Sequence, residues 1–219
     1  MKIHLQRELD SLNKHLFHLS SLVEDILEDA IQIITNNEGD RLAGIKAKDH
    51  EIDRLEVEVE EECLKILALH QPVAVDLRFL IAALKMNNDF ERIGDLAVNI
   101  AGAQHFLAAS ENRHLFTDHI LKMGHMARSM FRKSLEALMS RDEEKAIQVM
   151  ADDDEVDAYY YKLIELVKEE ISRGPNQAQE LIGWIMVAKH IERVADLATN
   201  IAEDTIYMVK GEIVRHGQG

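Results

Sequence analysis

An eleven-residue stretch decides the fold, and it reads Glu91-Arg92-Ile93-Gly94-Asp95-Leu96-Ala97-Val98-Asn99-Ile100-Ala101. It returns 101 residues later as Glu192-Arg193-Val194-Ala195-Asp196-Leu197-Ala198-Thr199-Asn200-Ile201-Ala202, with eight of the eleven positions identical. A repeat at a fixed spacing indicates a chain built from two similar halves. In each copy a glutamate and an aspartate four residues apart share one face of a helix. These two acidic pairs are therefore the first candidate functional residues.

Apolar residues recur every three or four positions along most of the chain, which is typical of helices that bury one face. The pattern predicts six long helices, at residues 5–36, 41–69, 72–108, 117–139, 141–173 and 176–210. Short connections between long helices make neighbours antiparallel. We therefore expect an all-α fold, a tandem repeat of two antiparallel three-helix bundles without strands. The expected domains are residues 1–109 and 114–212, separated by a linker at 110–113.

Four local features predict where these helices begin and end. Gly39 suits a left-handed helix end, and Asp40 suits the cap of the next helix. Pro72 suits the first turn of the third helix. Ser140 and Glu143 have the spacing of a capping box for the fifth helix.

Composition narrows the class of protein. The 219 residues carry a formal net charge of −15, which argues against nucleic acid or an anionic membrane surface as a partner. The single cysteine, Cys63, lies among apolar positions and is expected to be a buried thiol. The start of the chain lacks the apolar region of a signal peptide, and the longest apolar run, residues 181–188, is too short to cross a bilayer. We expect a cytoplasmic protein.

A second acidic pair precedes each repeated stretch by one helix. Asp49 and Asp53 occupy the second helix, and Asp153 and Asp157 occupy the fifth, 104 residues later. Adjacent antiparallel helices would bring four carboxylates together in each half. Such a group repels itself and needs cations or protons, and oxygen ligands suit Mg, Ca, Mn or iron. The predicted ligands are Asp49, Asp53, Glu91, Asp95, Asp153, Asp157, Glu192 and Asp196.

Further side chains flank the predicted ligands. Asn99 and Asn200, four residues beyond the final aspartates, are candidates for an extra ligand or for orienting one. Arg92 and Arg193 are candidates for charge balance around the site, or for surface ion pairs of little energetic value. Two histidines beside the acidic motifs, His50 and His190, are candidates for outer ligands, although surface histidines are the commoner case.

Two other functional classes remain open. One is a carboxylate-bridged metalloenzyme, either a hydrolase or an oxidase. Against the oxidase, the only Glu-x-x-His match is Glu111 with His114, at the linker, whereas a di-iron bundle uses two. Walker, Gly-x-Ser-x-Gly and Gly-x-Gly-x-x-Gly motifs are absent from the sequence. The other class is a metal-free helical adaptor, since a lone Glu-x-x-x-Asp on a helix is usually only a solvated face.

The chain resembles the PhoU family. The resemblance rests on the paired aspartates at 49/53 and 153/157, the segment Gln-Pro-Val-Ala-Val-Asp-Leu-Arg at 71–78, and the two repeated stretches. It covers nearly the whole chain. Ala195 stands where the family usually has glycine, and the second half lacks the Gln-Pro-Val-Ala segment.

The resemblance implies metal clusters on the acidic motifs, with iron foremost and Mn, Mg, Zn or Ca as alternatives. It implies a non-enzymatic, cytoplasmic negative regulator that couples the phosphate ABC transporter, through its ATPase subunit, to a sensor histidine kinase. It would reach the membrane only through these protein partners. A homodimer is also expected, because long helices leave broad faces.

Overall fold

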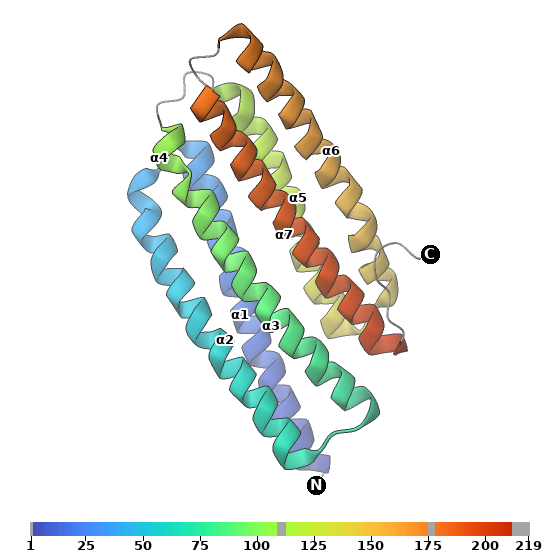
Figure 1. Ribbon diagram of the computed structural model, residues 1–219. Helices are drawn as coiled ribbons and strands as arrows, with labels where there is room; N and C mark the ends of the chain where they lie inside the picture. The colour runs from blue at the N-terminus through green and yellow to red at the C-terminus, as the bar shows by residue number, and fades with distance from the viewer. Residues whose placement is uncertain (1, 109–112, 175–177, 212–219) are drawn as a thin grey trace.

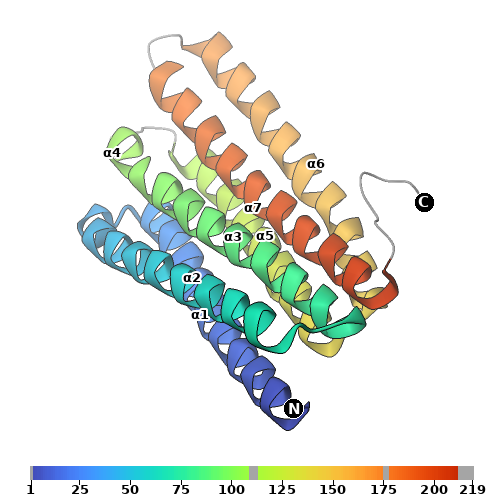
Figure 2. The same ribbon diagram turned by 60° about the horizontal axis from the view of Figure 1, so that its bottom comes forward.

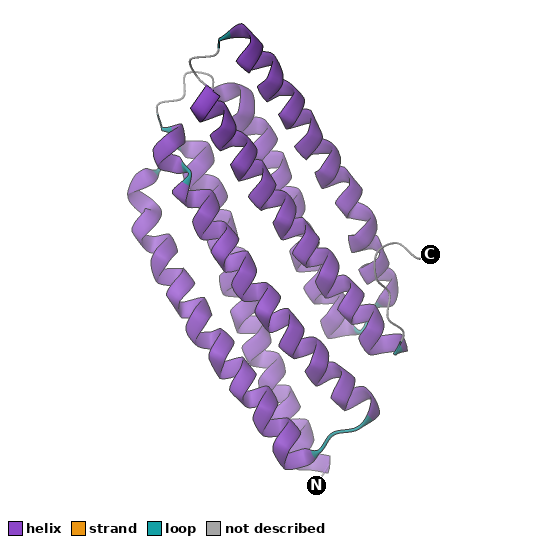
Figure 3. Cartoon of the chain, in the orientation of Figure 1, coloured by secondary structure: helices purple, strands orange, loops and turns teal. Residues whose placement is uncertain are grey.

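The computed structural model describes residues 2–108, 113–174 and 178–211, and these are helical almost throughout (Figure 3). The expected all-α fold with six long helices is confirmed, and no strand occurs within the described ranges. None of the described helices is both long and apolar enough to cross a membrane. The long helices are α1 (Lys2–Asn36), α2 (Leu42–His70), α3 (Ala74–Gly102), α5 (Arg113–Ser140), α6 (Glu143–Arg173) and α7 (Ala178–Lys210). The short ones are η1 (Gly39–Arg41) and α4 (Gln104–Leu107).

The helices form two layers (Figures 1 and 2). One layer runs α2, α3, α7, α6, and α1 and α5 lie side by side behind it. The first three-helix bundle is α1, α2 and α3, and the second is α5, α6 and α7. The bundles meet where α3 packs against α7 and α1 against α5. As a result, α1, α3, α5 and α7 each pack against three long helices, whereas α2 and α6 pack against two.

The core is one continuous cluster of buried apolar side chains from both bundles. The apolar face of α1 is buried from Leu9 onward and includes the fully buried Leu12, Leu19 and Ile26. Burying each side chain of this size contributes about 1.5–3 kcal/mol. Cys63 is also fully buried, as expected, and burial raises the pKa of its thiol to about 12.

The two halves keep the same register of buried residues. Buried Leu16 of α1 corresponds to buried Ile120 of α5, and Val59 of α2 corresponds to Leu163 of α6, each 104 residues later. Buried positions of α3 and α7 correspond 101 residues apart, as with the final pair of the repeated stretch, Ala101 and Ala202. The second half therefore repeats the first, and matching positions of its middle and last helices are three residues closer in sequence.

Polar contacts also join the halves. Arg78 of α3 donates from Nε to the carbonyl oxygen of Met208 near the end of α7, at 3.0 Å. Lys85 forms an ion pair with Asp204 of α7 at 2.5 Å. In the other layer Arg128 of α5 pairs with two glutamates of α1 at 3.1 and 2.6 Å. Together these contacts fix the position of α3 along α7 and of α5 along α1.

The predicted helix ends need correction. The left-handed residue after α1 is Asn37, with φ 66°, and not Gly39, which lies in η1 with Asp40. Asparagine tolerates this conformation because its short polar side chain reduces the steric cost. The cap position of α2 is Arg41, which makes no side-chain cap hydrogen bond.

Two further ends were also wrong. Pro72 lies before α3, which begins at Ala74 after the extended Val73. The predicted third helix is interrupted after Gly102, and α4 follows. Of the predicted linker at residues 110–113, the structure describes only Arg113, which is the first residue of α5. The rest lies outside the described residues. The residues at 176 and 177, expected to begin the last helix, also lie outside the described ranges.

The expected capping box was wrong as well. Ser140 is the last residue of α5, and its hydroxyl donates to the carbonyl oxygen of Glu136 at 2.6 Å. Asp142 caps α6 instead and accepts from the backbone N–H of Lys145 at 3.0 Å. The turn is so short that the serine still belongs to the preceding helix.

Gly124 tests the close packing of α5 on α1. A Cβ built at Gly124 would lie 2.5 Å from Cδ1 and 2.9 Å from Cγ1 of Ile31. We expect Gly124→Ala to lower the free energy of unfolding by about 1–2 kcal/mol, because overpacking outweighs the better helix propensity of alanine. Gly44→Ala in α2 is the matched control, since no atom lies within 4 Å of its Cβ. It should stabilise by about 0.5–1 kcal/mol. Urea denaturation measures both, and equal responses would contradict this packing.

Candidate metal centres

The first carboxylate group lies between α2 and α3. The two helices are in contact at Gly94, where a Cβ would lie 3.4 Å from Ile52 and 3.6 Å from Oδ1 of Asp49. Burial, together with the charges of Asp53 and Asp95, raises the pKa of Asp49. The aspartates of α2 therefore face the acidic motif of α3, as the sequence predicts.

Glu91 and Glu56 belong to the same group. Burial raises the pKa of Glu91, as do the charges of Asp95, Asp53 and Glu56, while Arg92 partly offsets the rise. Glu56 is half-buried on α2, and burial likewise raises its pKa. The first group thus holds five carboxylates, one more than the predicted ligand set.

One histidine lies beside this group. Asp49, His50 and Asp53 each offer one ligand atom, and these atoms lie within 4.8 Å of one another. His50 Nδ1 is 3.9 Å from Oδ2 of Asp53, and both of these side chains are largely exposed. His50 therefore lies where an outer ligand is expected. Exposed acidic groups such as this one are also common in proteins that bind no metal.

The second carboxylate group lies between α6 and α7. Burial, then the charges of Asp196, Asp157 and Glu192, raise the pKa of Asp153 to about 6. Burial and the charges of Glu192 and Asp157 also raise the pKa of Asp196. Oδ1 of Asp153 is buried, and no hydrogen-bond donor reaches it within the described part of the chain. The four predicted carboxylates of this half therefore act on one another through their charges, but among the described residues no three of them have ligand atoms within 4.8 Å of one another.

One cation in the second group was not anticipated. Lys189 Nζ donates to both carboxylate oxygens of buried Glu192, each at 2.6 Å. It also lies 5.4 Å from the ring centroid of Tyr160. Burial would lower the pKa of Lys189, but the hydrogen bond to Glu192 gives a net rise. A position-by-position comparison of the two halves beyond the repeated stretch would have found it, because asparagine stands at the matching position 88.

The flanking candidates lie at the rims of the two groups. Asn99 and Asn200 are exposed, as are both arginines, Arg92 and Arg193. His190 is half-buried, and its Nδ1 has no hydrogen-bond partner among the residues described. Burial, then Arg193, lowers the pKa of this imidazole. The structure leaves the ligand role of these side chains as a prediction.

The donor set fits a hard cation. Both groups consist of carboxylates, which Mg, Ca, Mn and iron accept as oxygen ligands. Bringing them together without a cation raises their pKa values, and the buried oxygen of Asp153 is left without a partner. A bound cation would relieve both costs.

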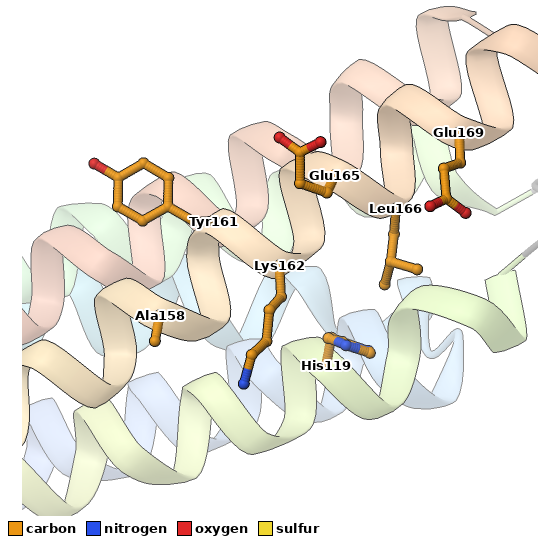
Figure 4. Close-up of a pocket in the computed structure, with 7 residues that line it drawn as sticks. All are labelled: His119, Ala158, Tyr161, Lys162, Glu165, Leu166 and Glu169. Carbon is orange, nitrogen blue, oxygen red and sulfur yellow. The ribbon is translucent and has the colours of Figure 1, made fainter.

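A pocket of about 450 Å³ lies elsewhere, between α5 and α6 (Figure 4). Leu166 and Lys162 of α6 point toward α5, which contributes His119. Burial lowers the pKa of His119. At the matching place in the first half, a hydrogen bond of 2.6 Å joins Nδ1 of His15 to Glu62, and leucine replaces this glutamate in the second half. None of the predicted metal ligands lines the pocket, whose residues are His119, Ala158, Tyr161, Lys162, Glu165, Leu166 and Glu169.

Comparisons with known proteins give the same family throughout. A family model described as the PhoU domain matches residues 16–103 and again 120–205. The phosphate-specific transport system accessory protein PhoU homolog of Clostridium acetobutylicum is 32% identical over 210 residues, covering 95% of each chain. PhoU homolog 1 of Thermotoga maritima is 30% identical and covers 96% of this chain and 90% of its own.

Two solved structures are similar in fold. PhoU of Pseudomonas aeruginosa superimposes with a TM-score of 0.89 at 29% identity, covering 94% of this chain and 99% of its own. The phosphate transport system regulatory protein PhoU of Streptococcus pneumoniae has a TM-score of 0.85 at 29% identity, covering 97% and 100%.

The raised pKa of Asp153 predicts a pH effect on stability. Its folded-state pKa of about 6 exceeds the ordinary 3.8, so the folded state holds this proton more tightly than the unfolded state. The free energy of unfolding should therefore fall as the pH rises from about 4 to about 6, and it should stay lower at higher pH. In chelator, we expect Asp153→Asn to stabilise by about 1–2 kcal/mol at about pH 7 and to have little effect near pH 4. Urea denaturation at both pH values measures the difference.

The neighbouring Asp152 is a matched control of opposite sign. Burial alone would raise its pKa, but hydrogen bonds from Lys133 and Gln148, at 2.7 and 2.8 Å, lower it. Asp152→Asn should therefore destabilise at about pH 7, because the folded state favours its charged form. Stabilisation by both variants would show a general effect of removing negative charge.

Proposed function

This chain belongs to the PhoU family, and from that premise we propose that it is a metal-binding accessory protein of a phosphate transport system. The observation that carries the metal proposal is the convergence of repeated acidic residues on two helix pairs, α2 with α3 and α6 with α7. The printed names of the curated relatives support the link to phosphate transport.

In the proposed first centre, Asp49, Asp53, Glu91 and Asp95 hold the metal, and Glu56 adds charge beside them. In the proposed second centre, Asp153, Asp157, Glu192 and Asp196 hold it. When bound, the metal would supply the positive charge that lets these carboxylates stay ionised together. Iron is the first candidate from the family resemblance, with Mn, Mg, Zn and Ca as alternatives.

We further propose that the protein acts in the cytoplasm as a negative regulator rather than as an enzyme. Its partners would be the ATPase subunit of the phosphate ABC transporter and a phosphate-responsive sensor histidine kinase. It would contact the membrane only through them, and it would form a homodimer. The description of the relatives as accessory proteins, and of one solved neighbour as a regulatory protein, supports this role over a metalloenzyme.

Metal analysis tests the ligand assignment. Protein purified without chelator should contain metal by elemental analysis. Asp95→Asn should lose the metal of the first centre and Asp196→Asn that of the second, because each removes one charged ligand. Glu51→Gln is the control, an exposed acid on α2 whose nearest cation, Arg54, is 3.9 Å away. Unchanged metal content in both aspartate variants would remove these residues from the ligand set, and a metal-free wild type would favour the simple adaptor.

Deletion of the gene tests the regulatory role. In phosphate-rich medium, the deletion strain should express phosphate-responsive phosphatase that the parent strain represses. The wild-type chain and Glu51→Gln should restore repression. The double variant Asp95→Asn with Asp196→Asn should not, if the metal is needed for signalling. Repression that persists after deletion would count against the regulator, and turnover of a phosphoester by the metal-loaded protein would favour an enzyme.

A further inference from the structure

We propose that the two carboxylate groups are unequal cation sites, because Lys189 is a built-in counter-ion that competes with the metal in the second group. This inference rests on the metal binding proposed above. It goes further in assigning an order of filling, in which the first centre takes up cations at lower concentration than the second.

The contact at the second group is direct. Lys189 lies one helical turn before Glu192 on α7, and its ammonium donates to both oxygens of that carboxylate at 2.6 Å. The side chain of Glu192 is only 12% exposed, so this ion pair lies at the protein surface with its acidic end buried. A metal that uses Glu192 must compete with the ammonium at both oxygens.

The first group lacks this cation. The residue that matches Lys189, 101 positions earlier, is Asn88, which is exposed on α3. The residue that matches Tyr160, 104 positions earlier, is Glu56. Within the described residues, no lysine or arginine forms a hydrogen bond or ion pair with a carboxylate of the first group. The nearest basic side chain paired with its five acids is His50, whose Nδ1 lies 3.9 Å from Oδ2 of Asp53, so a cation meets no bound ammonium there.

The charge balance gives the direction of the effect. Arg92 and Arg193 occupy matching positions, so they do not distinguish the two groups. Glu56 adds one carboxylate to the first group and Lys189 adds one ammonium to the second, a difference of two unit charges. Asp154 of the second group, which stands at the position matching His50, reduces this difference to one. Interactions between neighbouring unit charges are worth kilocalories per mole even near a protein surface. The second site should therefore bind a divalent cation more weakly.

Lys189 acts as a competitor and not as a permanent block. Its own side chain is 47% exposed, so the ammonium can leave Glu192 for water when a cation arrives. Lysine suits this role because its ammonium is a point charge on a flexible stem and is readily hydrated. A protein with one strong and one weak site responds to metal over a wider concentration range than one with two equal sites.

The test exchanges the two residues and measures Mn²⁺ binding to the full chain by isothermal titration and by electron paramagnetic resonance of free Mn²⁺. The first site is measured alone in a chain that also carries Asp153→Ala and Asp196→Ala. The second site is measured alone in a chain that also carries Asp49→Ala and Asp95→Ala. Lys189→Asn should tighten the second site roughly tenfold, and Asn88→Lys should weaken the first by a similar factor. Lys168→Asn, which removes a lysine paired with Glu165 at 2.6 Å elsewhere on α6, should change neither.

The outcomes separate the two proposals. Equal affinities of the two sites, with no response to either exchange, would overturn the competition by Lys189 while leaving the metal centres in place. A wild-type chain that binds no Mn²⁺ or Fe²⁺ at either site would overturn both. Circular dichroism checks that each variant is folded. If the double aspartate variants unfold, Asn88→Lys is measured in the otherwise wild-type chain. There the tighter of the two Mn²⁺ sites should become weaker.

Discussion

Enclosure of the two central helices is the constraint on which the rest of the structure depends. Because α3 and α7 each pack against three long helices, only one narrow strip of each reaches solvent. Mostly apolar side chains fill the other sides, with Asn87, Asp89 and Glu192 as buried exceptions, and the strip carries most of the charged and amide residues of the repeated stretch. Its exposed residues include Asn88, Arg92, Asp95 and Asn99 on α3 and Lys189, Arg193, Asp196 and Asn200 on α7. The outer helices α2 and α6 border these strips, so their acids meet those of the central helices.

The sequence predicts those parts of this arrangement that depend only on the spacing of residues along a single helix. The apolar face of α1 and the positions of the acidic pairs follow from spacing, since residues three or four apart share a face. Short connections then make α2 and α3 antiparallel neighbours, which brings Asp49 toward the motif of α3. The contact between the bundles could not be derived in this way. Pairs such as Lys85 with Asp204 join residues 119 apart, and no local pattern specifies them.

The capping box and the role of Lys189 could not be predicted, because neighbouring residues compete for the same partner. Two candidates for one cap, Ser140 and Asp142, lie two residues apart, and only the length of the α5 helix decides between them. The pairing of Lys189 with Glu192 depends on how deeply that glutamate is buried, because in water the ammonium would be hydrated instead. Spacing places both residues on one face, but burial decides whether they bind each other.

The difference in register between the halves bears on ancestry. Buried residues match at 104 positions along α6 as far as Val167, and at 101 positions along α7 from Leu181. Loss of three residues inside a helix would have turned every later side chain by about 300° and shifted it about 4.5 Å. Glu192 and Asp196 would then have left their partners on α6. The two halves are best understood as copies of one ancestral bundle that differ by three residues between Val167 and Leu181, where one helix gives way to the next, while the spacing of buried residues along each helix was kept.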